Sequence, residues 1–278
     1  MTSPILIAQI SDLHIKIPGA LAYGKVDTTA ALARCIETLN GLTPRPDLVV
    51  ISGDLADTPT AEEYAHLNAM LARLTLPFIA VPGNHDDRTL MRAALPGQGF
   101  ASASGALNTV RSVGDVDILA VDSTVPGQPY GLLDDDTLFW LDDMLRASDT
   151  RPAMLFLHHP PFLTGIGHMD AQNLKNADRL AALLARHPRV GLIGAGHVHR
   201  AALTTFAGRQ ATICPAPNHA VALDLDAHWP PSFVIEPPAF HLHVWSAGSG
   251  FGTIVTHTVP IGQFDGPHPF FGADGKLL

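Results

Sequence analysis

Short apolar runs that alternate with helical patterns are the feature that most constrains how this chain folds. The runs occupy residues 5–10, 48–51, 78–81, 116–121, 153–157 and 190–193. Between them, the spacing of apolar residues predicts helices over residues 28–42, 61–74, 135–146 and 176–187. Strands that alternate with helices in this way are typical of layered α/β folds.

Two helix starts have recognisable capping residues. Asp27 precedes the first helix as a candidate N-cap. Thr60 and Glu63 have the spacing of a capping box at the start of the second.

The pattern changes after residue 200. Extended stretches at 211–214, 221–225, 240–245 and 253–259 are separated by Pro- and Gly-rich turns, which predicts antiparallel sheet. We therefore expect a single domain over residues 1–278. Its core spans about 1–227, and a C-terminal β-hairpin extension and a wrapping tail span about 228–278.

Side chains that bind metals follow the apolar runs. The segments after five of the runs contain Asp12-Leu13-His14, Gly53-Asp54, Gly83-Asn84-His85-Asp86, His158-His159 and Gly196-His197-Val198-His199. In open α/β sheets, ligand sites form at the carboxyl ends of the strands, where the loops converge. A single Asp after a strand is usually a turn residue, but that explanation does not account for five strand ends of this kind.

Seven oxygen and nitrogen donors follow from this pattern: Asp12, His14, Asp54, Asn84, His158, His197 and His199. Seven donors exceed what one tetrahedral ion needs and suit two five- or six-coordinate ions that share a carboxylate. Carboxylate and imidazole together favour Fe, Mn, Co or Zn over Ca and Mg, which prefer oxygen ligands.

The composition limits the classes of partner. The formal charge is −9, so a nucleic acid polymer or an anionic membrane is not an expected partner, because both need clustered Lys and Arg. Cys35 and Cys214 are the only cysteines, too few for a disulfide framework. No apolar stretch approaches the ~18 residues of a membrane span, and no secretory signal is visible. We expect a cytoplasmic protein.

The ordered set of blocks resembles the calcineurin-like metallophosphoesterases, whose signature is D-x-H, G-D, G-N-H-D/E, a lone H and G-H-x-H. All five blocks are present in that order between Asp12 and His199. Four stretches are similar to one branch, the class III cyclic nucleotide phosphodiesterases and bacterial glycerophosphodiesterases. These are Ile10-Ser11-Asp12-Leu13-His14, His158-His159-Pro160-Pro161, Gly167-His168-Met169-Asp170 and Val255-Thr256-His257-Thr258-Val259-Pro260.

The resemblance implies a four-layer α/β/β/α sandwich and a binuclear metal centre. One metal would take Asp12, His14 and His199, and the other Asn84, His158 and His197, with Asp54 as the bridge. A metal-bound hydroxide would attack the phosphorus in line, and the two ions would stabilise the attacking and leaving oxygens. Two divalent ions would also supply the positive charge that this acidic chain lacks.

Two further histidines have roles only by resemblance. His85 would contact the phosphate and help to protonate the leaving oxygen, oriented by Asp86. His219 lies where the glycerophosphodiesterase-like branch has a second phosphate-facing histidine. Asn84, His85 and His219 are therefore the expected substrate contacts, and Asp54, His85 and His219 the expected catalytic residues.

The expected activity is hydrolysis of a small phosphodiester, either a cyclic nucleotide or a glycerophosphodiester. A broad-specificity phosphomonoesterase or organophosphate hydrolase is the alternative, and a metal-free scaffold of the same fold is a further one. Relatives in this family associate, so we expect a homo-oligomer, a dimer or larger.

Other histidines have simpler interpretations. His159 follows a ligand directly, so in extended backbone its side chain faces away from the metals. His241, His243 and Trp245 alternate with apolar residues, and a solvated sheet face is the default for such a stripe. The loop 160–175 and residues 23–25 are two candidate walls of a substrate pocket.

Overall fold

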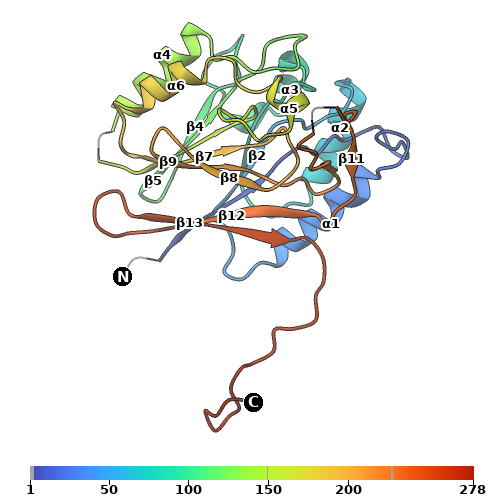
Figure 1. Ribbon diagram of the computed structural model, residues 1–278, viewed down its shortest axis with the longest axis vertical. Coiled ribbons are helices and arrows are strands. Elements are labelled where there is room, and N and C mark those ends of the chain that lie inside the picture. Colours follow the sequence, from blue (N-terminus) through green and yellow to red (C-terminus); the bar gives the residue numbers. More distant parts are fainter. Residues whose placement is uncertain (1–2, 149, 227) are drawn as a thin grey trace.

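The computed structural model describes residues 3–148, 150–226 and 228–278. Two β-sheets lie face to face, and helices cover the outer face of each (Figure 1).

The first sheet has five strands in the order β13-β12-β1-β2-β3. Strands β1, β2 and β3 are parallel, and β12 pairs antiparallel with β1 and with β13. Their bounds are Ile5–Ile10 (β1), Leu48–Ser52 (β2), Phe78–Val81 (β3), Ala239–Ser246 (β12) and Thr253–Pro260 (β13). The predicted C-terminal hairpin therefore exists, and it completes the first sheet beside β1.

The second sheet has six strands in the order β4-β5-β6-β7-β9-β8, with β5, β6, β7 and β9 parallel. The bounds are Thr109–Val113 (β4), Val116–Val121 (β5), Ala153–Leu157 (β6), Val190–Ala195 (β7), Ala202–Phe206 (β8) and Arg209–Ile213 (β9). A separate short ribbon pairs β10 (Ala220–Val221) with β11 (Phe233–Val234).

The four predicted helices begin at or within one residue of their predicted starts, and two short helices, over residues 88–94 and 167–170, were not predicted. They are α1 (Thr28–Gly41), α2 (Ala61–Leu71), α3 (Arg88–Ala94), α4 (Asp135–Arg146), α5 (Gly167–Asp170) and α6 (Ala177–Leu184), with a 3-10 turn η1 at Pro96–Gln98. The Asp27 carboxylate accepts a hydrogen bond from the Ala30 amide, as an N-cap does. The capping box is only half formed, because Glu63 accepts from the Thr58 amide and not from Thr60. Helices α2 and α6 each end three residues before the predicted boundary.

Three apolar layers hold the sandwich together. One packs α1 and α2 against the first sheet, a second fills the space between the sheets, and a third packs α4 and α6 against the second sheet. Phe156 and Ile7, both fully buried, meet in the middle layer. This arrangement confirms the predicted α/β/β/α sandwich.

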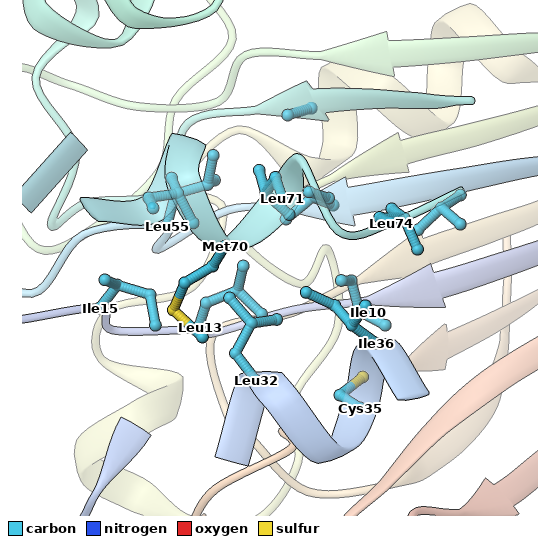
Figure 2. Close-up of a cluster of buried hydrophobic side chains, with 14 of the residues drawn as sticks. Ile10, Leu13, Ile15, Leu32, Cys35, Ile36, Leu55, Met70, Leu71 and Leu74 are labelled. Atoms are coloured by element: carbon cyan, nitrogen blue, oxygen red, sulfur yellow. The ribbon is translucent and has the colours of Figure 1, made fainter. Parts of the chain in front are cut away.

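Figure 2 shows how the first apolar layer anchors the loops that follow β1 and β2. Leu13, Ile15 and Leu55 alternate with the predicted ligands and insert between side chains of α1 and α2. All three are fully buried. Anchoring Leu13 and Ile15 in this core fixes the loop that carries Asp12 and His14.

The histidine stripe on β12 differs from the predicted solvated face. His241, His243 and Trp245 are buried, because β12 is covered by the second sheet. His243 lies between Thr256 Oγ1 at 2.9 Å and Gln9 Oε1 at 3.1 Å, so both ring nitrogens have partners. The Gln9 amide in turn donates to Ser52 Oγ and to the Ala195 carbonyl, which ties the two sheets together.

Two other predictions are wrong. The stretch 221–225 forms a strand only at its start, in β10. The segment after β13 does not wrap around the body, but extends away from it (Figure 1). Among the described residues, no helix is long and apolar enough to cross a bilayer.

Because His241 is buried, we expect the folding stability of the protein to fall at acidic pH. Burial lowers its pKa to about 4, below the ~6.5 of an unfolded chain. Between these values the unfolded state binds the extra proton, so the stability is complete above pH 6.5 and is lost as the pH falls. This one group should cost about 2 kcal/mol between pH 7 and pH 5. In urea unfolding, the free energy of unfolding of His241→Gln should fall less between pH 7 and pH 5 than that of the unsubstituted protein, by that amount.

The exposed His228 supplies the control, since His228→Gln should leave the pH dependence of unfolding unchanged. An identical pH dependence for His241→Gln and the unsubstituted protein would contradict the assignment of a neutral buried imidazole.

Candidate metal centre

The ligand-bearing loops are held together by backbone hydrogen bonds that continue the β1–β2 pairing beyond the strands. The Asp12 amide donates to the Gly53 carbonyl at 3.0 Å, and the His14 amide donates to the Asp54 carbonyl at 2.9 Å. The site therefore starts at the carboxyl ends of β1 and β2, as predicted.

Five of the seven predicted ligands have left-handed backbone conformations. Their φ values are 57° for Asp12, 46° for His14, 51° for Asp54, 73° for His197 and 57° for His199. Residues other than glycine adopt positive φ uncommonly, and each such residue costs of order 1–3 kcal/mol where the conformation is strained. Such conformations persist only where the surrounding packing holds the residues in place, and they are concentrated at functional sites.

Glycines in two motifs make room for the ligands. Gly53 has φ +104°, and a Cβ there would lie 2.3 Å from His158 Nδ1. A Cβ on Gly83 would lie 2.2 Å from Asp54 Oδ1. Any larger residue at either position would displace a predicted ligand.

The structure brings Asp12, His14, Asp54 and His199 into one buried group, with donor atoms within 4.8 Å of one another. His14 Nε2 lies 3.2 Å from His199 Nε2, and His199 Nε2 lies 3.4 Å from Asp12 Oδ1. These four residues come from the loops after β1, β2 and β7.

Asp54 connects this group to the remaining predicted ligands. Its Oδ2 lies 3.4 Å from His14 Nε2 and also 3.4 Å from His158 Nε2. His158 Nε2 is 3.2 Å from Asn84 Oδ1, and the His158 and His197 rings are 5.1 Å apart. All seven predicted donors thus lie together, with Asp54 between the two halves.

The electrostatics of the site call for a cation. Burial raises the pKa of Asp12, with the nearby Asp54 charge adding to the effect. Burial also opposes ionisation of Asp54, but His158 and His85 hold its pKa well below the usual range. Burial disfavours the charged form of His158, yet the Asp54 and Asp12 charges raise its pKa to about 9. Two buried carboxylates among imidazoles are costly without positive charge, so the donor set fits bound metal ions.

His85 lies beside this group, and its partner differs from the predicted one. Its amide donates to Asp54 Oδ1 at 2.9 Å, and its Nδ1 lies 2.8 Å from the Asp57 carbonyl oxygen. The expected orienting residue, Asp86, does not bond to His85. Asp86 accepts from the amides of Gly83, Leu55 and Ala56 and from the Tyr64 hydroxyl, and so ties the β2 and β3 loops together.

His219 reaches the same site from the turn before β10. Its ring lies 4.5 Å from that of His199 and 5.3 Å from that of Tyr23. Burial, with a contribution from His199, lowers the pKa of His219 to about 3. The preceding Asn218 donates to the carbonyls of Asp12 and Leu13, which fixes this turn against the first loop.

A cavity of about 860 Å³ opens next to Asn84 and His85. Its other walls are residues 57–59, 86–89, 103–105 and 124–127, together with Arg92. The loop 160–175 is not among them, because Ile166 and Met169 pack into a small apolar cluster instead. The sequence motifs did not predict these cavity walls, because the small and polar loop residues that form them have no characteristic spacing.

The prediction that His159 faces away from the metals is wrong. One of its ring nitrogens lies within 4.8 Å of donor nitrogens of His158 and His197. The residue is fully buried, and its Nδ1 is 2.8 Å from Ser123 Oγ.

The fold and this donor set define a class of phosphoester-cleaving proteins. The family model for the calcineurin-like phosphoesterases matches residues 5–201. The chain belongs to this family.

Curated relatives extend the match beyond that segment. The chain is 38% identical over 275 residues to a probable glycerophosphodiester phosphodiesterase, GpdQ, of Arcobacter nitrofigilis, covering 99% of this chain and 100% of the relative. It is also 31% identical over 213 residues to the 3',5'-cyclic adenosine monophosphate phosphodiesterase CpdA of Escherichia coli K12, with 76% of each chain covered. Among solved structures, a dimetal phosphatase from Danio rerio has a TM-score of 0.64 at 14% identity, covering 94% of this chain and all of that one. That likeness concerns the fold.

Metal binding should stabilise the protein. At an ion concentration a hundred times the dissociation constant, binding adds about 2.7 kcal/mol, which corresponds to several degrees in Tm. Adding Mn²⁺ or Zn²⁺ to chelator-treated protein should therefore raise Tm. Asp54→Asn should abolish most of that rise, because the bridging charge is lost. Differential scanning fluorimetry measures both.

Asp134, the N-cap of α4 in the far helical layer, provides the control. Asp134→Asn should keep the full metal-induced rise in Tm. An undiminished rise in Asp54→Asn would show that Asp54 is not a shared ligand.

Proposed function

We propose that this chain is a two-metal phosphodiesterase that hydrolyses small diesters, with glycerophosphodiesters as the preferred class. The carrying observation is that Asp54 lies between two groups of donors, with its Oδ2 3.4 Å from His14 Nε2 in one group and 3.4 Å from His158 Nε2 in the other. The GpdQ relative, named for glycerophosphodiester cleavage, matches over essentially the whole chain, which supports the preferred class.

In this proposal Asp12, His14 and His199 hold one metal, and Asn84, His158 and His197 hold the other, with Asp54 shared. One ring nitrogen, Nε2, is directed at other donors in three of these histidines, His14, His158 and His199. His158 Nδ1 donates to the Ser52 carbonyl at 2.9 Å, which leaves Nε2 free for a metal. When bound, the metals (Fe, Mn, Zn or Co) would act as Lewis acids that neutralise phosphate charge and make water acidic enough to serve as the nucleophile.

His85 is the proposed proton donor to the leaving alcohol. Since the Asp57 carbonyl only accepts, His85 Nδ1 keeps its hydrogen. To protonate the leaving alcohol, His85 would carry a second hydrogen on Nε2 as the imidazolium, and giving that hydrogen away returns the ring to its neutral form. His85 and Asn84 border the large cavity, which gives room for the alcohol portion of the ester. His219, beside His199, is the proposed second phosphate contact.

We further propose that the chain acts as a homo-oligomer in the cytoplasm. The exposed C-terminal segment bears Phe264, Phe270 and Phe271, which are 67%, 79% and 58% exposed, and a second copy would cover them. Cys35 and Cys214 are both buried free thiols, which suits a reducing compartment.

Replacing the proposed proton donor should separate catalysis from metal binding. His85→Ala should lower kcat by about 10²- to 10⁴-fold, the usual contribution of general acid catalysis. Both metals should remain bound, because His85 is outside the donor set. Steady-state kinetics and metal analysis of the same preparation test this.

His257, exposed on β13, is the control, and His257→Ala should keep normal kcat. Near-normal turnover by His85→Ala with full metal content would remove His85 from the mechanism.

A substrate panel tests the proposed class. The Mn-, Zn- and Co-loaded protein should cleave bis(p-nitrophenyl) phosphate faster than p-nitrophenyl phosphate. It should also cleave glycerophosphoethanolamine with a higher kcat/KM than cyclic AMP. Equal or faster monoester hydrolysis would favour a phosphomonoesterase, and a preference for cyclic AMP would reassign the substrate class.

A further inference from the structure

We infer that Asp57 is a positioning residue that fixes two functional histidines at once, His14 through its carboxylate and His85 through its backbone carbonyl. Asp57 belongs to none of the motif blocks. The inference rests on the two-metal site proposed above.

The backbone places Asp57 beside the site. Its amide donates to the Ile15 carbonyl at 3.1 Å, and Ile15 forms a parallel bridge with Ala56. This short continuation of the β1–β2 pairing sets the Asp57 side chain, 13% exposed, next to the His14 ring.

Each oxygen of the carboxylate has its own partner. His14 Nδ1 lies 3.1 Å from Asp57 Oδ1, and Lys16 Nζ lies 2.8 Å from Asp57 Oδ2. A carboxylate only accepts hydrogen bonds, so His14 Nδ1 carries the hydrogen and Nε2 presents its lone pair to Asp54 and His199. A carboxylate behind a ligand histidine also makes the ligand nitrogen more basic, and removing such a partner typically weakens metal binding about 10- to 100-fold.

The main chain of the same residue orients the second histidine. His85 Nδ1 donates to the Asp57 carbonyl oxygen at 2.8 Å, while the His14 and His85 rings meet edge to face at 4.7 Å. One residue thereby sets the tautomer of a proposed metal ligand and of the proposed proton donor. A side-chain substitution removes only the first of these effects.

Asp57→Asn tests the carboxylate. An amide has one acceptor oxygen, so Lys16 and His14 compete for it, and the amide hydrogens face whichever group loses. When the hydrogens face His14, its Nδ1 must accept and its Nε2 is protonated, which prevents binding to a metal. We expect the affinity of one of the two metals to fall about 10- to 100-fold, with the other unchanged. Isothermal titration of metal-free protein with Mn²⁺ or Zn²⁺ measures both constants.

Removing the competitor should rescue the variant. In Lys16→Met/Asp57→Asn the amide oxygen is free to accept from His14, so the lost affinity should be largely restored. Lys16→Met alone should bind both metals normally. A residue with a merely structural role would not be rescued by deleting a second contact.

Asp87, an exposed carboxylate that caps α3 and lines the same cavity, is the matched control. Asp87→Asn removes one negative charge and should leave both constants unchanged. At saturating metal, Asp57→Asn should keep a kcat well above that of His85→Ala, because the carbonyl that holds His85 remains.

Three results would overturn the inference: normal binding of both metals by Asp57→Asn, equal weakening of both, or no rescue by Lys16→Met. Failure of the proposed function is distinct, since the unsubstituted protein would then bind no metals or cleave no diester.

Discussion

The structure depends on the burial of two carboxylates, Asp12 and Asp54, where the loops of the two sheets meet. Burying two like charges a few ångströms apart opposes folding unless positive charge lies close by. Imidazoles from four separate loops surround them, and the arrangement suits cations that are not part of the polypeptide. Folding stability and phosphate chemistry thus have the same origin, since the charge that compensates Asp54 is also the charge that would attract a phosphodiester.

The scaffold holds this costly site by packing on the opposite side of each loop. Leu13, Ile15 and Leu55 bind the ligand loops into the core formed with α1 and α2 (Figure 2). On the other side of the first sheet, Gln9 and His243 connect β1 and β12 to Ser52 and to the second sheet. The left-handed ligands persist because their neighbours are fixed from both directions.

Residues outside the motif blocks orient the side chains of several proposed site histidines. Asp57 accepts from His14 and His85, Ser52 accepts from His158, and Asn218 fastens the turn that carries His219. The contacts from Asp57 and Ser52 decide which ring nitrogen of His14, His85 and His158 faces the site. Together with those of Asn218, they join loops that lie 28 to 206 positions apart in the chain, so no local sequence pattern reveals them.

The layered α/β architecture could be predicted from local periodicity, and the proposed donor set from the polar residues that recur after buried strands. The helix starts at Asp27 and Thr60 were also readable, since capping depends on neighbours three residues away. Tertiary structure alone decided that β12 pairs with β1, which buries His241, His243 and Trp245 instead of exposing them. It also decided that Asp57, and not Asp86, holds His85. The physical reason is the same in both cases: the direction of a hydrogen bond and the covering of a sheet face depend on segments distant in sequence, and a strand pattern is identical whether a second sheet or water lies above it.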